Sequence, residues 1–79
     1  MTSKTSYDST MTREEVAAYL HAIADEFASG EEDATIDLGN KQVTVQPSDK
    51  VNVDVTVTER DAMLRKNRQK LDLELKWRP

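Results

Sequence analysis

The sequence predicts an α+β fold in which one N-terminal helix packs on a four-stranded antiparallel meander sheet, as a two-layer sandwich. Three observations predict it. Apolar residues recur with helical spacing between residues 13 and 29. From residue 34 the period changes to two, over residues 34–45, 51–58 and 70–77. Turn-forming sequences separate these stretches, so consecutive strands are expected to pair as antiparallel neighbours.

Residues 1–10 are rich in Ser and Thr and are expected to form a flexible tail, followed by a single domain over residues 11–79. Thr12 followed by Glu15 is a capping-box sequence, which predicts that a helix begins at residue 13. Gly30 can adopt the left-handed conformation that ends a helix, so the helix is expected over residues 13–29. Its apolar stripe consists of Val16, Tyr19, Leu20, Ile23 and Phe27.

The first hairpin is predicted around a two-residue turn at residues 39–40, Gly-Asn. Pairing across this turn places Ile36 opposite Val43 and Ala34 opposite Val45. These side chains share one face of the hairpin because side chains alternate along a strand. The residues between them are polar, which is typical of a sheet with one buried face.

The second pair of strands has the same alternation. Strand 51–58 carries valine at every second position, and strand 70–77 carries three leucines and then Trp77. Antiparallel return sets Val57 opposite Leu71 and Val51 opposite Trp77. The connection at residues 59–69 shows no alternation, and it is expected to be a short helical turn or a mobile segment.

Composition excludes several classes of protein and site. The chain has no cysteine, and its formal net charge is −4, which disfavours attraction to nucleic acid or anionic lipid. No apolar run resembles a signal peptide or a membrane span, so a soluble cytoplasmic protein without membrane contact is expected. The single histidine, His21, lacks the partners of a metal site.

Acidic residues offer no catalytic or metal site either. The carboxylates at residues 25–26 and 31–33 lack calcium-loop spacing and are expected to form a solvated acidic turn. Asp54, Asp72 and Glu74 fall on the open face of the sheet, and a flat face offers no pocket for acid–base chemistry. We therefore expect a non-enzymatic protein with no catalytic residue, no metal and no cofactor.

The width of the predicted sheet points to a partner. Four strands span about 19 Å at roughly 4.8 Å each, whereas one helix is about 10 Å wide. Part of the apolar face therefore requires another cover, and a homodimer or another protein is expected to supply it. The candidate interface residues are Tyr19, Leu75 and Trp77, together with the backbone of strand 70–77.

The alternative function is nucleic-acid binding through the basic connection at residues 60–70. Its possible phosphate contacts are Arg60, Arg65, Lys66, Arg68 and Lys70. No aromatic residue interleaves with them to stack on bases, and the open sheet face nearby is acidic. Nucleic acid is therefore the less favoured partner, and salt dependence of binding distinguishes the two.

An N-terminal helix of the form "TREEVAAYLHAIADEF", short alternating strands and a last strand "LDLELKW" together resemble the amphi-Trp domain family. The resemblance covers residues 11–78, and the chain departs from it in its long basic connection. The family is met often in halophilic archaea and has no assigned activity, and an acidic composition suits such a cytoplasm. The resemblance thus implies the α+β fold and a cytoplasmic setting, and it carries over no catalytic residue.

Overall fold

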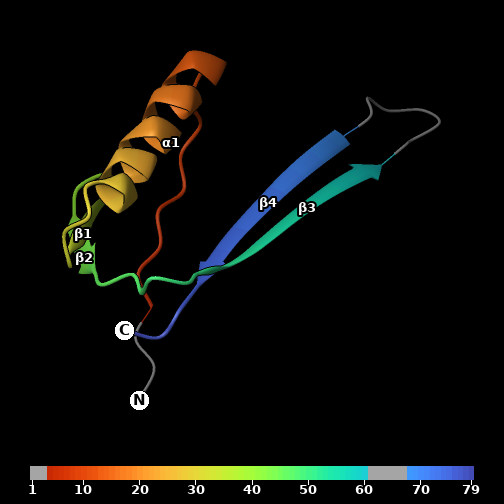
Figure 1. The fold of residues 1–79 in the computed structure, drawn as a ribbon. Coiled ribbons are helices and arrows are strands. Elements are labelled where there is room, and N and C mark those ends of the chain that lie inside the picture. Colours follow the sequence, from red (N-terminus) through yellow and green to blue (C-terminus); the bar gives the residue numbers. More distant parts are fainter. Residues whose placement is uncertain (1–3, 61–67) are drawn as a thin grey trace. The chain divides into compact units, whose positions relative to one another are not determined.

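The computed structural model describes residues 4–60 and 68–79. The elements in chain order are α1 (Arg13–Ala28), β1 (Ala34–Asp37), β2 (Gln42–Val45), β3 (Asn52–Arg60) and β4 (Arg68–Lys76) (Figure 1). They fall into two compact units, Met1–Pro47 and Ser48–Pro79. The α+β class is confirmed. The flexible tail at residues 1–10 and the single domain at residues 11–79 stay predictions.

The helix begins and ends as its sequence predicts, to within one residue. The Thr12 hydroxyl accepts a hydrogen bond from the Glu15 N–H at 3.1 Å. The Glu15 carboxylate accepts one from the Thr12 N–H at 3.3 Å, which completes the capping box. At the other end Ser29 is the C-cap, and Gly30 follows it with φ of 77°.

We expect Thr12→Ala to lower the free energy of unfolding by about 1 kcal/mol, because it removes the side-chain acceptor of the capping box. Urea denaturation followed by circular dichroism at 222 nm measures this loss. Thr10→Ala, which changes a threonine that precedes the capping box, is the control. Equal stability of the Thr12 variant and the wild type would show that the cap adds nothing to the folded chain.

The first hairpin has the register that its sequence predicts. Ile36 pairs with Val43 and Ala34 with Val45, in an antiparallel ladder. The Leu38 N–H donates to the Lys41 carbonyl at 2.8 Å and closes the turn. Gly39 has φ of 80°, whereas no non-glycine residue among those described has positive φ. Glycine adopts this positive φ without the steric cost of a Cβ atom, which accounts for Gly39 in the turn.

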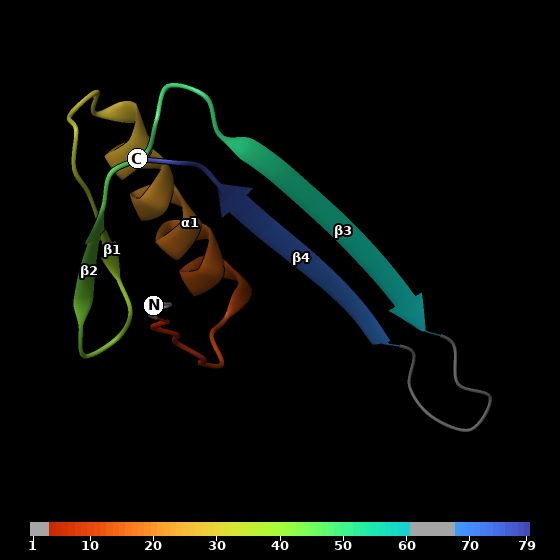
Figure 2. The ribbon, with the colours of Figure 1, turned by 90° about the horizontal axis from the view of Figure 1, so that it is seen from below.

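Helix α1 lies against β1 and satisfies backbone groups on the outer edge of that strand (Figure 2). Residues 35 and 37 alternate with the hydrogen-bonded pairs, so their N–H and C=O groups point away from β2. The Glu26 carboxylate accepts from the Thr35 N–H at 2.7 Å, and the Tyr19 hydroxyl donates to the Asp37 carbonyl. The expected solvated acidic turn is therefore wrong for Glu26, since its carboxylate occupies a strand edge.

The core of the Met1–Pro47 unit is small. Ala34, 1% exposed, is the buried apolar residue among those described. The helix and the hairpin of this unit also carry half-buried side chains: Tyr19, Ile23, Phe27, Ile36, Val43 and Val45. Only part of the predicted apolar stripe of the helix is half-buried, because Val16 and Leu20 are 42% and 44% exposed.

The second hairpin is longer than its sequence predicts. Val57 pairs with Leu71, as predicted, and the ladder then continues outward to Arg60 opposite Arg68. The prediction of a helical turn or mobile connection is wrong for residues 59, 60, 68 and 69, which extend the two strands. The Gln69 side-chain amide donates to the Glu59 carboxylate at 3.0 Å across this extension. Residues 61–67 lie outside the described residues.

The strands form two two-stranded antiparallel sheets, β1–β2 and β3–β4. Strand β1 is hydrogen-bonded to β2, and strand β3 is hydrogen-bonded to β4. The single four-stranded meander, and with it the two-layer sandwich, is not confirmed. The two hairpins therefore count as separate sheets in the residues that the structure describes.

Candidate interaction surface

The β3–β4 hairpin presents one apolar face. Its cross-strand pairs put Val57 beside Leu71 and Val55 beside Leu73 on the same side of the ladder. The exposed apolar residues of this face are 53% to 67% accessible: Val53, Val55, Val57, Leu71 and Leu73. Strands of nine residues give a face roughly 30 Å long. A contiguous apolar strip of this length is typical of a surface that contacts another protein.

The opposite face of the same hairpin carries charges in separate zones. Arg60 pairs with Arg68 at the end farthest along β3, and Lys70 follows next on β4. Acidic residues come after these, where Asp54 pairs with Glu74. Lys70 and Asp72 lie 3.6 Å apart on β4, and Lys76 and Glu74 lie 3.2 Å apart. This face is exposed and has no buried polar group, so it is a solvated face with a charge pattern along β4.

Two of the predicted interface residues lie at the end of β4. Leu75 pairs with Val53 and is half-buried. Trp77 follows the strand directly and is also half-buried. The predicted pairing of Val51 with Trp77 lies one step beyond the ladder, which ends at Asn52 opposite Lys76. Leu75 and Trp77 therefore both lie at the C-terminal end of β4, and part of each side chain is accessible.

Tyr19, the third predicted interface residue, belongs to the other unit. Besides its hydrogen bond to the Asp37 carbonyl, its ring lies 6.3 Å from the Tyr7 ring, tilted by 52°. Desolvation raises the pKa of the Tyr19 hydroxyl, and the nearby Asp37 carboxylate and Tyr7 add to the rise. Tyr19 therefore joins the helix to the first hairpin, and its role at an interface stays a prediction.

We expect the stability of the fold to fall as pH rises above about 10, because of Tyr19. Its pKa is raised in the folded chain, so the folded state holds the proton more tightly than the unfolded state. This contribution is complete below the unfolded pKa and is lost as pH rises through the folded one. Urea denaturation between pH 8 and 11 measures it, and Tyr19→Phe should flatten the dependence. Because Tyr7 adds to the rise of the Tyr19 pKa, Tyr7→Phe should flatten the dependence only in part, and an equal flattening would contradict the assignment.

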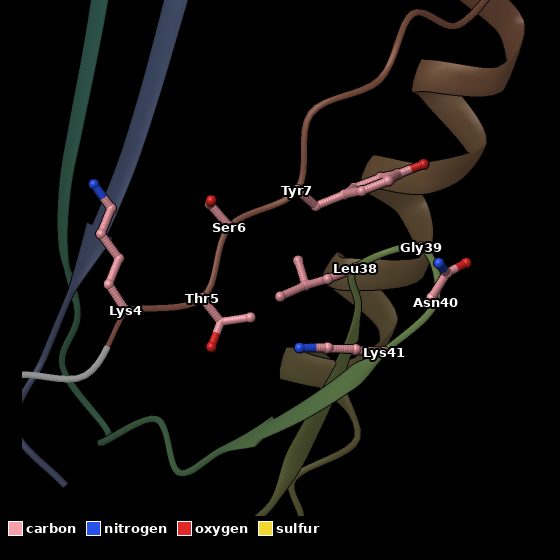
Figure 3. A pocket seen from close by; sticks show the side chains of 8 residues that line it. All are labelled: Lys4, Thr5, Ser6, Tyr7, Leu38, Gly39, Asn40 and Lys41. Atoms are coloured by element: carbon pink, nitrogen blue, oxygen red, sulfur yellow. The ribbon is translucent and has the colours of Figure 1, made fainter.

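Sequence reasoning missed Tyr7, which it assigned to a flexible tail. The Tyr7 ring lies over Gly39 in the turn of the first hairpin (Figure 3). A shallow, mostly polar hollow lies between residues 4–7 and 38–41. An aromatic residue in an otherwise polar segment was the signal that could have indicated packing. Tyr7 therefore contacts the turn of the first hairpin, whereas the hollow beside it has no charged side chain that is buried.

The residues of the nucleic-acid alternative are only partly described. Arg60 and Arg68 stand directly opposite each other, and Lys70 lies opposite Thr58 on the same face. These three cations form a basic end of the hairpin. Arg65 and Lys66 lie outside the described residues. Two arginines in one cross-strand pair repel each other, so this end is suited to an anionic group.

Comparison with known proteins gives a family. The sequence model of the Amphi-Trp domain matches residues 1–79. No curated protein and no solved structure matches the chain. In the part of the chain that the structure describes, no helix has the length and apolar character needed to cross a membrane.

Proposed function

The chain belongs to the Amphi-Trp domain family, and we propose that it is a small, non-enzymatic, cytoplasmic interaction domain that associates with a second copy of itself. The surface proposed for this association is the apolar face of the β3–β4 hairpin, together with the outer edge of β4. The observation that carries the proposal is the exposure of that face, whose valines and leucines are 53% to 67% accessible over nine-residue strands.

The physical argument rests on the stability of hairpins. An isolated two-stranded hairpin is at best marginally stable in water, and further strands or a covering layer are needed to stabilise it. A strand edge also exposes unpaired backbone groups that accept another strand. In the first hairpin the Thr35 N–H on β1 is satisfied by Glu26, and the Asp37 carbonyl by Tyr19. At the edge of β4, the backbone of a second copy would supply the missing hydrogen-bond partners.

The four-stranded meander beneath α1, which the sequence predicts, is part of this proposal. In that arrangement β3 has a strand on each side and β4 is an outer strand. The edge of β4, with Leu75 and Trp77 at its end, is then the edge that a second copy can reach. The part of the apolar face that one helix is too narrow to cover lies along the same strand.

Light scattering over a range of protein concentrations, at low and at high salt, tests the proposal. We expect a dimer that persists at high salt, because apolar association is not weakened by screening. A monomer at every concentration would overturn the proposal. Circular dichroism of the same samples distinguishes a folded monomer from an unfolded chain.

A second candidate function, nucleic-acid binding, is favoured by the Arg60–Arg68 pair. A phosphate between the two guanidinium groups would replace their repulsion by charge-assisted hydrogen bonds. Binding of single-stranded RNA or DNA oligonucleotides, measured by fluorescence anisotropy, tests it. Affinity that falls steeply between 50 and 200 mM salt would support this function. Unchanged binding in the Arg60→Gln/Arg68→Gln variant would exclude a role for the pair.

A further inference from the structure

The charges and the length of β4 together favour one way for two copies of this strand to pair. We propose that β4 pairs antiparallel with β4 of a second copy about a twofold axis at Leu71, so that two hairpins form one continuous four-stranded sheet. This inference rests on the proposed self-association and adds to it the edge, the direction and the register. Its partner is a second copy of this chain, identified by charge complementarity.

The faces of the hairpin limit the registers that are available. In an antiparallel pair, directly opposite residues project from the same face of the sheet. Leu71 and Leu73 project from the apolar face, and Lys70 and Asp72 from the polar face. Apolar faces of two copies become continuous only when the twofold axis passes through a residue position. Each register of this kind is therefore defined by the residue that faces its own copy.

The register centred on Leu71 brings opposite charges together on the polar face over residues 68–74. Lys70 of each copy faces Asp72 of the other, and Arg68 faces Glu74. Each of these two pairs forms twice because of the symmetry, which gives four opposite-charge pairs. Residues 68–74 hold no like-charge pair in this register. On the apolar face Leu71 meets its own copy, and Leu73 meets the aliphatic part of Gln69.

Registers centred on neighbouring residues are less favourable within the strand. Centring on Lys70 or Asp72 places that charged residue against its own copy. Centring on Leu73 makes every charged pair repulsive, since Asp72 faces Glu74 and Lys70 faces Lys76. Centring on Glu74 again opposes two identical carboxylates. Centring on Leu75 also pairs opposite charges, Glu74 with Lys76, but it aligns only residues 74–76 of β4, whereas the register centred on Leu71 aligns residues 68–74. The charges and the length of the paired segment together therefore favour the register centred on Leu71.

Strand β3 of the same hairpin lacks a charge pattern that favours one register. Its polar face carries two charges among the described residues, Asp54 and Arg60. A β3–β3 pairing could form the Asp54–Arg60 contact twice, which is half the number on β4. Lys70 and Asp72 have side chains that are 72% and 53% exposed, so both remain accessible to a second copy. Because exposed ion pairs contribute little affinity, their role is to fix the register.

Cysteine cross-linking tests the register directly, because the natural chain contains no cysteine. Leu71→Cys should form a disulfide-linked dimer under a mild oxidant, since opposite Cα atoms lie about 4.5–5.5 Å apart. Leu73→Cys is the matched control on the same face of the same strand. In the proposed register two copies of residue 73 are offset by about 13 Å along the strand, beyond the reach of a disulfide.

Mixed charge reversal gives an independent test in which no apolar residue changes. Lys70→Glu and Asp72→Lys should each weaken the homodimer about tenfold, because two attractive pairs become repulsive. Mixing the two variants should restore affinity, because Glu at position 70 of one chain then faces Lys at position 72 of the other. Both chains have lost their own Lys70–Asp72 contact, so an effect within one chain would not be restored.

The outcomes separate this inference from the proposed function. Cross-linking of the Leu71 variant together with rescue on mixing supports the register. A stable wild-type dimer that cross-links through residue 73, or that shows no rescue, overturns the register and leaves self-association standing. A monomeric wild type with no cross-link at either position overturns both.

Discussion

Replacing Leu71 and Leu73 together by threonine is expected to weaken self-association about a hundredfold. Both residues lie on the apolar face of β4 and are 67% and 53% exposed in the single chain. In the proposed register these residues make three cross-strand contacts, one between the two copies of Leu71 and two between Leu73 and Gln69, each worth roughly up to 1 kcal/mol. A loss near 3 kcal/mol corresponds to about a hundredfold in the dissociation constant. Analytical ultracentrifugation over a concentration series measures it.

The matched control is Val55→Thr/Val57→Thr on β3. These valines are the cross-strand partners of the two leucines and are 58% and 64% exposed. The control therefore makes the same hairpin face more polar but leaves β4 intact. Pairing through the edge of β4 predicts a much smaller loss of dimer in the control. Equal losses in both variants would mean that two apolar faces stack, and unchanged dimers in both would contradict the proposed surface.

The second large effect concerns Gly39, where substitution by alanine is expected to cost about 2–3 kcal/mol. Positive φ of 80° costs an L-residue about 1–2 kcal/mol in the left-handed region. A Cβ atom at Gly39 would also lie 2.7 Å from Cε1 of Tyr7, a contact that requires the tail to move. The substitution therefore combines backbone strain with loss of the Tyr7 contact. Urea denaturation followed by circular dichroism measures the cost.

Gly30→Ala separates the two contributions. Gly30 has nearly the same φ, 77°, and a Cβ there would meet nothing within 4 Å. Its substitution should cost only the strain, about 1–2 kcal/mol. The difference between the two variants then measures the Tyr7 contact, and Tyr7→Ala should remove that difference in a double-mutant cycle. Equal costs at both glycines would show that Tyr7 does not pack on the turn in solution.

Local sequence signals predicted most of the secondary structure. The Thr12–Glu15 capping box and Gly30 set the ends of α1, and both work through hydrogen bonds or backbone angles within a few residues. The registers of both hairpins followed from alternation, because a shift by one residue would move every side chain to the wrong face. These features need no knowledge of distant parts of the chain.

The length of the second hairpin could not be predicted in the same way. Residues 59–60 and 68–69 carry no apolar alternation, so no periodic pattern predicts a strand there. The ladder extends because backbone pairing continues once two strands are aligned, whatever side chains they carry. For the same reason the basic residues Arg60 and Arg68 became a cross-strand pair rather than part of a loose connection.

The candidate surface, too, was predictable in part from the sequence. The apolar face of β3–β4 and the charges of β4 were visible in the alternation of residues 70–77. The sequence also placed Tyr19 on the apolar stripe of the helix, but its hydrogen bond to the Asp37 carbonyl depends on a partner 18 residues away. No periodic pattern encodes which backbone group a given hydroxyl reaches.

The sequence by itself thus determined the order of elements, the ends of the helix, the pairing within each hairpin and the polarity of each face. Only the tertiary structure decided that Glu26 and Tyr19 occupy the edge of β1 and that Tyr7 lies over Gly39. The first group follows from interactions between near neighbours in the chain. The second follows from contacts between segments that packing brings together, and their geometry depends on the position of the whole helix relative to the strand.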